Sequence, residues 1–114
     1  MRLAERVYTP DNWVILKIRE SKMSKPFYKV LGGWSGGYAS GDSWRMNSGI
    51  AEFIDKGDHY EAVGFSGSVY VCRKSSYGLR MNCAHVYTTL KEKEGFENQV
   101  VLMDEDTDWS GVAW

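Results

Sequence analysis

Residues 13–20, WVILKIRE, place aliphatic side chains at every second position. Val14, Leu16 and Ile18 fall on one side of an extended chain, and Lys17 and Arg19 fall on the other. A period of two is the pattern of a strand that has one face against a core. This stretch therefore predicts a β-strand.

Further strands are indicated by short apolar runs bounded by glycine, proline or asparagine. We expect them at 26–34, 44–54, 59–65, 68–74 and 98–104. Pro26 suits the first residue of a strand, where a missing N–H is tolerated. The glycine-containing turn DKGD, residues 55–58, joins the two strands beside it as a hairpin. The runs from 44 to 74 therefore predict an antiparallel meander.

The period changes after residue 82. Asn82 is a residue type that caps the N-terminus of a helix, and Gly95 is one that ends it. Apolar side chains recur at nearly helical spacing between them: Cys83, Val86, Tyr87 and Leu90. Short strands with glycine-rich turns and one helix predict a mainly β fold. We expect a small, strongly bent antiparallel sheet or barrel, SH3-like or Sm-like, with one short helix in the C-terminal half.

The chain has 114 residues, the length of one domain with a single core. We place this domain at 1–103. Residues 104–114 are expected to be an acidic, tryptophan-containing tail, because four acids cluster there: Asp104, Glu105, Asp106 and Asp108. No apolar run approaches the roughly 18 residues of a membrane span, and the first residues lack the apolar stretch of a signal peptide. We expect no membrane association and a cytoplasmic location.

Residues 32–45, GGWSGGYASGDSWR, combine five glycines with two tryptophans and a tyrosine. Such a stretch is too polar for a buried strand, and aromatic side chains on surface loops indicate contact with a partner. Residues 70–80, YVCRKSSYGLR, add cations beside aromatic rings without an acid. The predicted binding surface is Trp34, Tyr38, Trp44, Arg45, Arg73, Lys74, Tyr77 and Arg80. The alternative is that Trp34 packs in the core and 70–80 is a solvated strand end.

The net charge of −1 favours a protein partner, because non-specific affinity for nucleic acid comes mainly from neutralised phosphates. We therefore expect a non-catalytic binding module for a protein. The alternative partner is single-stranded nucleic acid, whose bases stack on aromatic rings beside cations.

Catalytic and metal-binding patterns are incomplete in the sequence. Cys83 and His85 are the nearest thiol and imidazole, but two helical residues at this spacing point about 200° apart. Cys72, Cys83, His59 and His85 follow no spacing of a known metal site, and both cysteines are expected to be free thiols. We expect no catalytic residues, metal or cofactor. A small enzyme that uses Cys72 or Cys83 is the alternative, and thiol reactivity would separate the two.

The last predicted strand is apolar, and a tryptophan follows it that a small core need not absorb. Pairing of this strand with the edge of a second copy would bury both the strand and the tryptophan. The predicted homo-oligomer interface is Val100, Val101, Leu102, Met103 and Trp109. The alternative is a monomer in which the strand joins its own sheet and Trp109 caps its own core.

Several stretches resemble small proteins of marine tailed bacteriophages and their ocean-metagenome relatives. The stretches are YTPDNWVILKI, YKVLGGWSGGY, SWRMNSGI, SGSVY and DEDTDW, and the likeness runs over most of the chain. The resemblance implies a phage accessory protein in the cytoplasm of a host cell. It implies no catalytic or binding residue.

Overall fold

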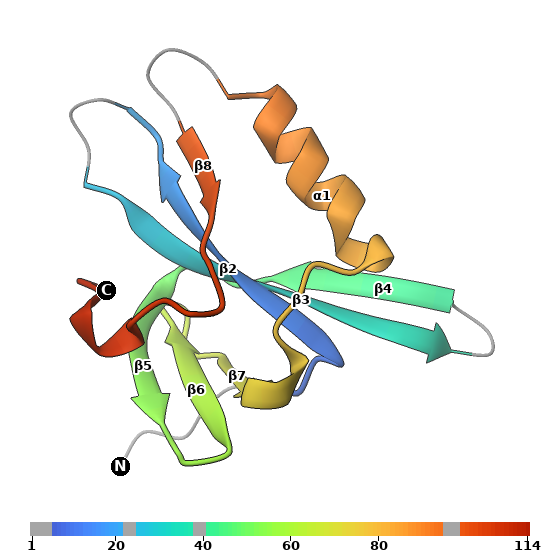
Figure 1. Cartoon of the computed structure of the whole chain (residues 1–114), viewed down its shortest axis with the longest axis horizontal. Helices are drawn as coiled ribbons and strands as arrows, with labels where there is room; N and C mark the ends of the chain where they lie inside the picture. Colours follow the sequence, from blue (N-terminus) through green and yellow to red (C-terminus); the bar gives the residue numbers. More distant parts are fainter. Residues whose placement is uncertain (1–5, 22–24, 38–40, 95–98) are drawn as a thin grey trace.

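The strand expected at WVILKIRE is the centre of the fold. The computed structural model describes four stretches of chain: residues 6–21, 25–37, 41–94 and 99–114. In it, β2 (Asn12–Arg19) pairs antiparallel with β3 (Phe27–Gly37) and with β8 (Gln99–Leu102), and β4 (Gly41–Met46) pairs with the far side of β3. These strands form the central sheet, in the order β4-β3-β2-β8 (Figure 1).

A second sheet has the order β1-β7-β6-β5. Its antiparallel meander comprises β5 (Ile50–Asp55), β6 (His59–Gly64) and β7 (Val69–Arg73), and β1 (Val7–Tyr8) runs parallel to β7. Gly57, in the turn between β5 and β6, has φ of 101°, a backbone conformation that suits glycine. The DKGD hairpin is confirmed, and so is the predicted meander from Ile50 to Arg73, whereas residues 44–46 belong to β4 of the central sheet.

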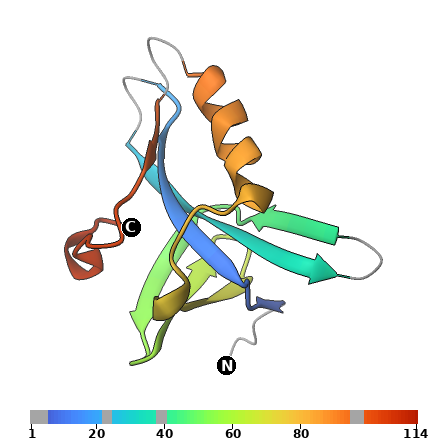
Figure 2. The same ribbon diagram turned by 45° about the vertical axis from the view of Figure 1, so that its right-hand side comes forward.

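The helix α1 (Met81–Glu92) and the second sheet cover opposite faces of the central sheet (Figure 2). Alternation along β2 assigns the faces. Trp13 and Ile15 point toward the second sheet, and Val14 and Leu16 point toward α1. The fold therefore has three layers, with the central sheet in the middle.

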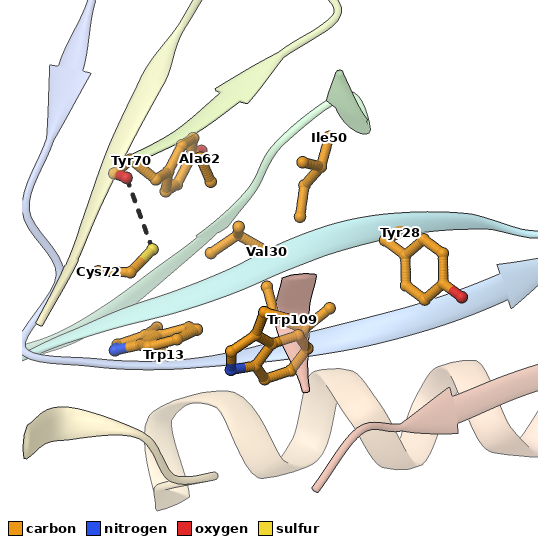
Figure 3. Close-up of a cluster of buried hydrophobic side chains, with 9 residues drawn as sticks. Trp13, Tyr28, Val30, Ile50, Ala62, Tyr70, Cys72 and Trp109 are labelled. Atoms are coloured by element: carbon orange, nitrogen blue, oxygen red, sulfur yellow. Dashed lines mark hydrogen bonds between the residues drawn. The ribbon is translucent and has the colours of Figure 1, made fainter. Parts of the chain in front are cut away.

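Each face of the central sheet has its own core. The aliphatic core lies under α1 and consists of Val14, Leu16, Leu31, Cys83, Val86 and Val100. The aromatic core lies between the two sheets and consists of Trp13, Ile15, Tyr28, Val30, Ile50, Ala62, Tyr70, Cys72 and Trp109 (Figure 3). A large apolar side chain in such a core stabilises the fold by about 1.5–3 kcal/mol.

The mainly β class is confirmed, with one α-helix in the described chain. The strand predicted at 44–54 is divided, because Asn47 turns the chain from the central sheet to the second. Its N–H donates to the carbonyl of Val30 at 3.1 Å, and its Oδ1 accepts from the N–H of Val30 at 2.9 Å. The described strands form two open sheets instead of one closed barrel. An SH3-like or Sm-like type stays a prediction.

The helix begins one residue before its predicted cap. Arg80 is the N-cap, without a side-chain cap hydrogen bond, so the prediction that Asn82 caps the helix is wrong. The backbone closes the first turn instead, because the N–H groups of Cys83 and Ala84 both donate to the carbonyl of Arg80. Within the described stretches, no helix is long and apolar enough to cross a bilayer.

Residues 104–114 pack against the domain. They contain a short 3-10 turn, η2 (Trp109–Gly111), which carries Trp109 into the aromatic core. Asp108 caps this turn, since its carboxylate accepts from the N–H and the hydroxyl of Ser110 at 3.2 and 2.6 Å. The boundary between a domain and a tail at 103/104 stays a prediction.

Candidate functional site

The predicted binding surface is divided between separate parts of the molecule. Trp44 and Arg45 are neighbours on β4, so their side chains leave opposite faces of the central sheet. Trp44 is 45% exposed and lies edge-on to His85 of α1, with 6.5 Å between the ring centroids. The Arg45 guanidinium lies over the Tyr8 ring, 4.6 Å from its centroid.

Trp34 lies near Arg45 because both contact Tyr8. Its ring meets Tyr8 edge-on at 6.3 Å, and its Nε1 donates to the carbonyl of Thr9 at 3.1 Å. Arg80 is exposed at a different place, directly before α1. Tyr38 lies outside the described residues.

The remaining predicted residues have partners within the chain. Arg73, at the end of β7, donates through Nη2 to the carbonyls of Pro10 and Asp11 at 3.3 and 3.4 Å. Lys74 begins the turn η1 (Lys74–Ser76), and its ammonium group pairs with Asp55 at 2.9 Å. The two side chains are thus fixed to different segments.

The Tyr77 hydroxyl links β2 to the residue that follows β8. Its hydroxyl donates to the carbonyl of Met103 and accepts from the N–H of Ile15, the latter at 3.2 Å. Burial raises the pKa of Tyr77 to about 12. The described residues of the predicted surface therefore do not share one exposed face, although Lys74 and Tyr77 line the same cavity.

This cavity belongs to a cleft between the second sheet and the C-terminal segment, which we call the aromatic cleft. It consists of two adjoining hollows that share Tyr60 and Trp109 in their walls. One hollow, of about 270 Å³, is lined by Phe53, Asp55, Tyr60, Thr107, Asp108, Trp109 and Ser110. The other, of about 230 Å³, is lined by Trp13, Tyr60, Lys74, Tyr77, Glu105, Asp106 and Trp109.

The β5–β6 hairpin supplies one wall of the aromatic cleft. Phe53 and Asp55 are two residues apart on β5, and Tyr60 pairs with Asp55 across the hairpin, so the three side chains share a face. The rings of Phe53 and Tyr60 stack with 4.6 Å between centroids. Trp109 closes the wall, 5.6 Å from Phe53.

A cation already lies in the aromatic cleft. The Lys74 ammonium is 4.7 Å from the centroid of the Tyr60 ring while it pairs with Asp55. The hydrogen bond with Asp55 raises the pKa of Lys74, and the same bond, with a further one from the Gly57 N–H, lowers the pKa of Asp55. Both groups therefore stay charged at neutral pH. A ring face and a carboxylate together are the usual surroundings of a bound ammonium or guanidinium group.

The rim of the aromatic cleft is acidic. Four carboxylates line it, against the single ammonium of Lys74: Asp55, Glu105, Asp106 and Asp108. Glu105 and Asp106 are exposed and form no ion pair with any described residue. The cleft can therefore attract a further cation.

Both thiols lie away from this cleft wall. Cys72 is in the aromatic core and Cys83 in the aliphatic core, and burial raises the pKa of each thiol. His85 is exposed and turned toward Trp44, not toward Cys83. In the described part of the chain, no three His, Cys, Asp or Glu side chains gather as they would around a metal ion.

The predicted interface residues have contacts within their own chain. β8 pairs with β2, and Trp109 is in the aromatic core. The outer edge of β8 is covered at Val100, whose N–H donates to Glu94 at 2.8 Å and whose carbonyl accepts from Lys91 at 3.0 Å. Leu102 and Met103 are half-buried, and Val101 is 44% exposed. Association through these residues stays a prediction, but strand pairing at Val100 would have to displace Lys91 and Glu94.

Sequence reasoning missed the hairpin wall of the cleft. Phe53 and Tyr60 stand on either side of the predicted DKGD turn, and aromatic side chains at diagonal positions on one face of a hairpin are a readable signal. The meeting of Trp109 with this hairpin has no local signal. No family model, curated protein or solved structure matches the chain. Its function is therefore inferred from the geometry of the aromatic cleft.

Proposed function

We propose that this domain is a non-catalytic binding module for a protein partner, and that the aromatic cleft receives a lysine or arginine side chain of that partner. The observation that carries the proposal is the ammonium of Lys74, held between the Tyr60 ring and Asp55 within an acidic rim. A partner's cation would meet the same two kinds of group beside Glu105 and Asp106.

The expected affinity of one side chain is modest. A cation over an aromatic ring contributes about 0.5–1 kcal/mol at an exposed site and about 2 kcal/mol when desolvated. An exposed ion pair adds about 0–1 kcal/mol and weakens with salt. Backbone and apolar contacts around the cleft would supply the rest of the affinity, which is why a protein segment suits the site better than a free amine.

Two alternatives are less well supported. Carboxylates at the rim repel phosphates, and the cations Arg45, Arg73 and Arg80 stand apart, which disfavours a single-stranded nucleic acid. A cysteine enzyme needs an exposed thiol with a lowered pKa, whereas burial raises the pKa of Cys72 and Cys83. The phage resemblance adds that the partner would be met in the cytoplasm of a host cell.

Three tripeptides test the proposal, acetyl-Gly-Xaa-Gly-amide with lysine, trimethyllysine or norleucine as Xaa. The readout is the indole N–H signal of each tryptophan in nitrogen-15 NMR spectra at low salt. We expect the two cationic peptides to shift the signal of Trp109 with a millimolar Kd, and norleucine to leave it in place. The signal of Trp44, on the far side of the central sheet, should not move.

The acidic rim is tested by removing its charge. The double variant Glu105→Gln, Asp106→Asn should raise the Kd for the lysine peptide about threefold to tenfold, because two attractions between exposed charges are lost. The matched control is the double variant Glu52→Gln, Glu92→Gln, which removes two exposed acids outside the cleft lining and should leave the binding of the peptide unchanged. Equal shifts by all three peptides would refute the cation site. If a decathymidine oligonucleotide shifts the indole signals of Trp34 and Trp44 instead, the nucleic-acid alternative is favoured.

A further inference from the structure

A second charged surface lies beside the aromatic cleft. Beyond Ile15, the alternation of β2 brings Lys17 and Arg19 to the face that carries Trp13, and β8 brings Val101 and Met103 to that face from the other side. A hollow of about 310 Å³ marks this place, lined by Lys17, Arg19, Pro26, Gln99, Val101 and Met103. We call these six residues the β8 strip.

The cations of the β8 strip have no acidic partner among the described residues. Lys17 and Arg19 are half-buried and form no ion pair with any described residue, and the Nε of Arg19 is buried without a hydrogen bond among those residues. A buried donor that lacks an acceptor costs about 1–3 kcal/mol, so an approaching anion would relieve that cost. The strip is therefore suited to a carboxylate next to an apolar group.

The chain supplies such a group directly after β8. Asp104, Glu105 and Asp106 are exposed and without an ion pair in the described chain. Arg19 stands opposite Gln99 at the start of β8, and Lys17 stands opposite Val101. Along β8 the surface thus runs from positive, through apolar Val101 and Met103, to negative.

A surface with this order of charges is complementary to itself after a two-fold rotation. We propose that a second copy of the chain docks on the β8 strip, with a two-fold axis between Val101 and Met103. Lys17 and Arg19 of each copy then face residues 104–106 of the other, and the apolar side chains meet at the axis. The contact uses a face of the strands, so the bonds of Val100 to Lys91 and Glu94 stay intact.

The dimer is a weak one. Residues 99–103 extend only about 17 Å at roughly 3.3 Å per residue. We expect a contact along this short segment to bury less surface than the roughly 1,200–2,000 Å² of stable interfaces. Four attractions between half-buried cations and exposed acids hold it, and salt screens them over about 10 Å at 0.1 M. The proposal shares Glu105 and Asp106 with the rim of the aromatic cleft, but Lys17 and Arg19 do not line the cleft, so the variant of these two cations tests the dimer separately from the cleft.

Reversal of each charge group separately tests the arrangement. One variant carries Lys17→Glu and Arg19→Glu, and the other carries Glu105→Lys and Asp106→Lys. In sedimentation equilibrium at 20 mM salt, from about 10 µM to 1 mM protein, we expect the natural chain to dimerise, with a Kd at least tenfold weaker at 500 mM salt. Each variant alone should stay monomeric, because its strip repels itself. The equimolar mixture should dimerise, because the signs are again opposite.

The control variant, Lys56→Glu with Arg80→Glu, makes the same change of net charge as the Lys17, Arg19 variant, but outside the strip, and should dimerise like the natural chain. Melting temperatures confirm that each variant is folded. If a reversed variant does not fold, the neutral pairs Lys17→Gln with Arg19→Gln and Glu105→Gln with Asp106→Asn replace it, and each should weaken the dimer at least tenfold. A natural chain that is monomeric at 1 mM and low salt overturns the proposal. So does a mixture of reversed variants that stays monomeric.

Discussion

The two faces of the central sheet are closed by different kinds of side chain. Mainly aliphatic groups of β2, β3, β8 and α1 meet on one face, and most of them bring no polar atom. Tryptophan and tyrosine dominate the other face, and each brings a polar atom that must find a partner. Trp13 donates through Nε1 to the carbonyl of Arg73 at 2.7 Å, and Tyr77 bonds to Met103 and Ile15. Large rings held by such bonds leave hollows between them, and the aromatic cleft lies there.

The largest effects are expected from removing one large side chain on each face of the central sheet, in the variants Trp13→Ala and Leu31→Ala. Both side chains are fully buried, so we expect losses of about 3–5 and 2–5 kcal/mol in the free energy of unfolding, measured by urea denaturation. Trp13 also forms a wall of the aromatic cleft. The folded Trp13→Ala protein should therefore bind the lysine tripeptide less well, while Leu31→Ala leaves that binding unchanged. If Leu31→Ala weakens the binding of the lysine tripeptide as much as Trp13→Ala does, the two faces are not independent.

A smaller effect is expected from removing a single hydroxyl on each face. Tyr77→Phe leaves the carbonyl of Met103 and the N–H of Ile15 without their shared partner, at a cost of about 1–3 kcal/mol. Tyr87 packs on the aliphatic core, and its hydroxyl has no hydrogen bond among the described residues. Tyr87→Phe should thus leave the urea midpoint almost unchanged. Equal losses for the two variants would remove the distinction between the faces.

The smallest effect concerns the edge of the aliphatic side, where Glu94 covers Val100. The hydrogen bond from the Val100 N–H, followed by that from Lys91, lowers the pKa of Glu94 below its ordinary value of 4.5. A carboxylate with a lowered pKa stabilises the fold fully above its unfolded pKa, and this contribution is lost as the pH falls through the folded pKa. Glu94→Gln should therefore lower the melting temperature slightly at pH 7.

The difference in melting temperature should shrink as the pH falls below 4.5 and disappear once the pH is below the lowered pKa of Glu94. Glu92→Gln, a neighbouring exposed acid of α1, is the control and should have no effect at either pH. If the melting temperatures of the natural chain and of Glu94→Gln differ by the same amount from pH 7 to pH 3, the charge of Glu94 does not stabilise the contact with β8.

Local pattern was enough for most of the elements. The alternation in WVILKIRE specified β2, and the DKGD turn specified the β5–β6 hairpin, because these signals act between residues that are close in the chain. The expectation of one buried face for β2 is wrong, because the second sheet also covers the face of Trp13 and Ile15. The prediction failed where a side chain replaced a backbone partner. Asn47 bonds to Val30 and splits the run from 44 to 54 between two sheets, which hydrophobic periodicity alone does not reveal.

The candidate site was predictable in its ingredients but not in its assembly. Lys74, Tyr77 and Trp109 stood out in the sequence as a cation and aromatic rings, and the acids of 104–108 stood out as a cluster. Only packing brings Trp109 against Phe53 and the acids beside Tyr60, about fifty residues away in the chain. Strand period and turn chemistry are local properties, which the sequence determines by itself. The order of the sheets and the position of the last eleven residues depend on which apolar faces cover one another, and that is decided only when the whole chain has folded.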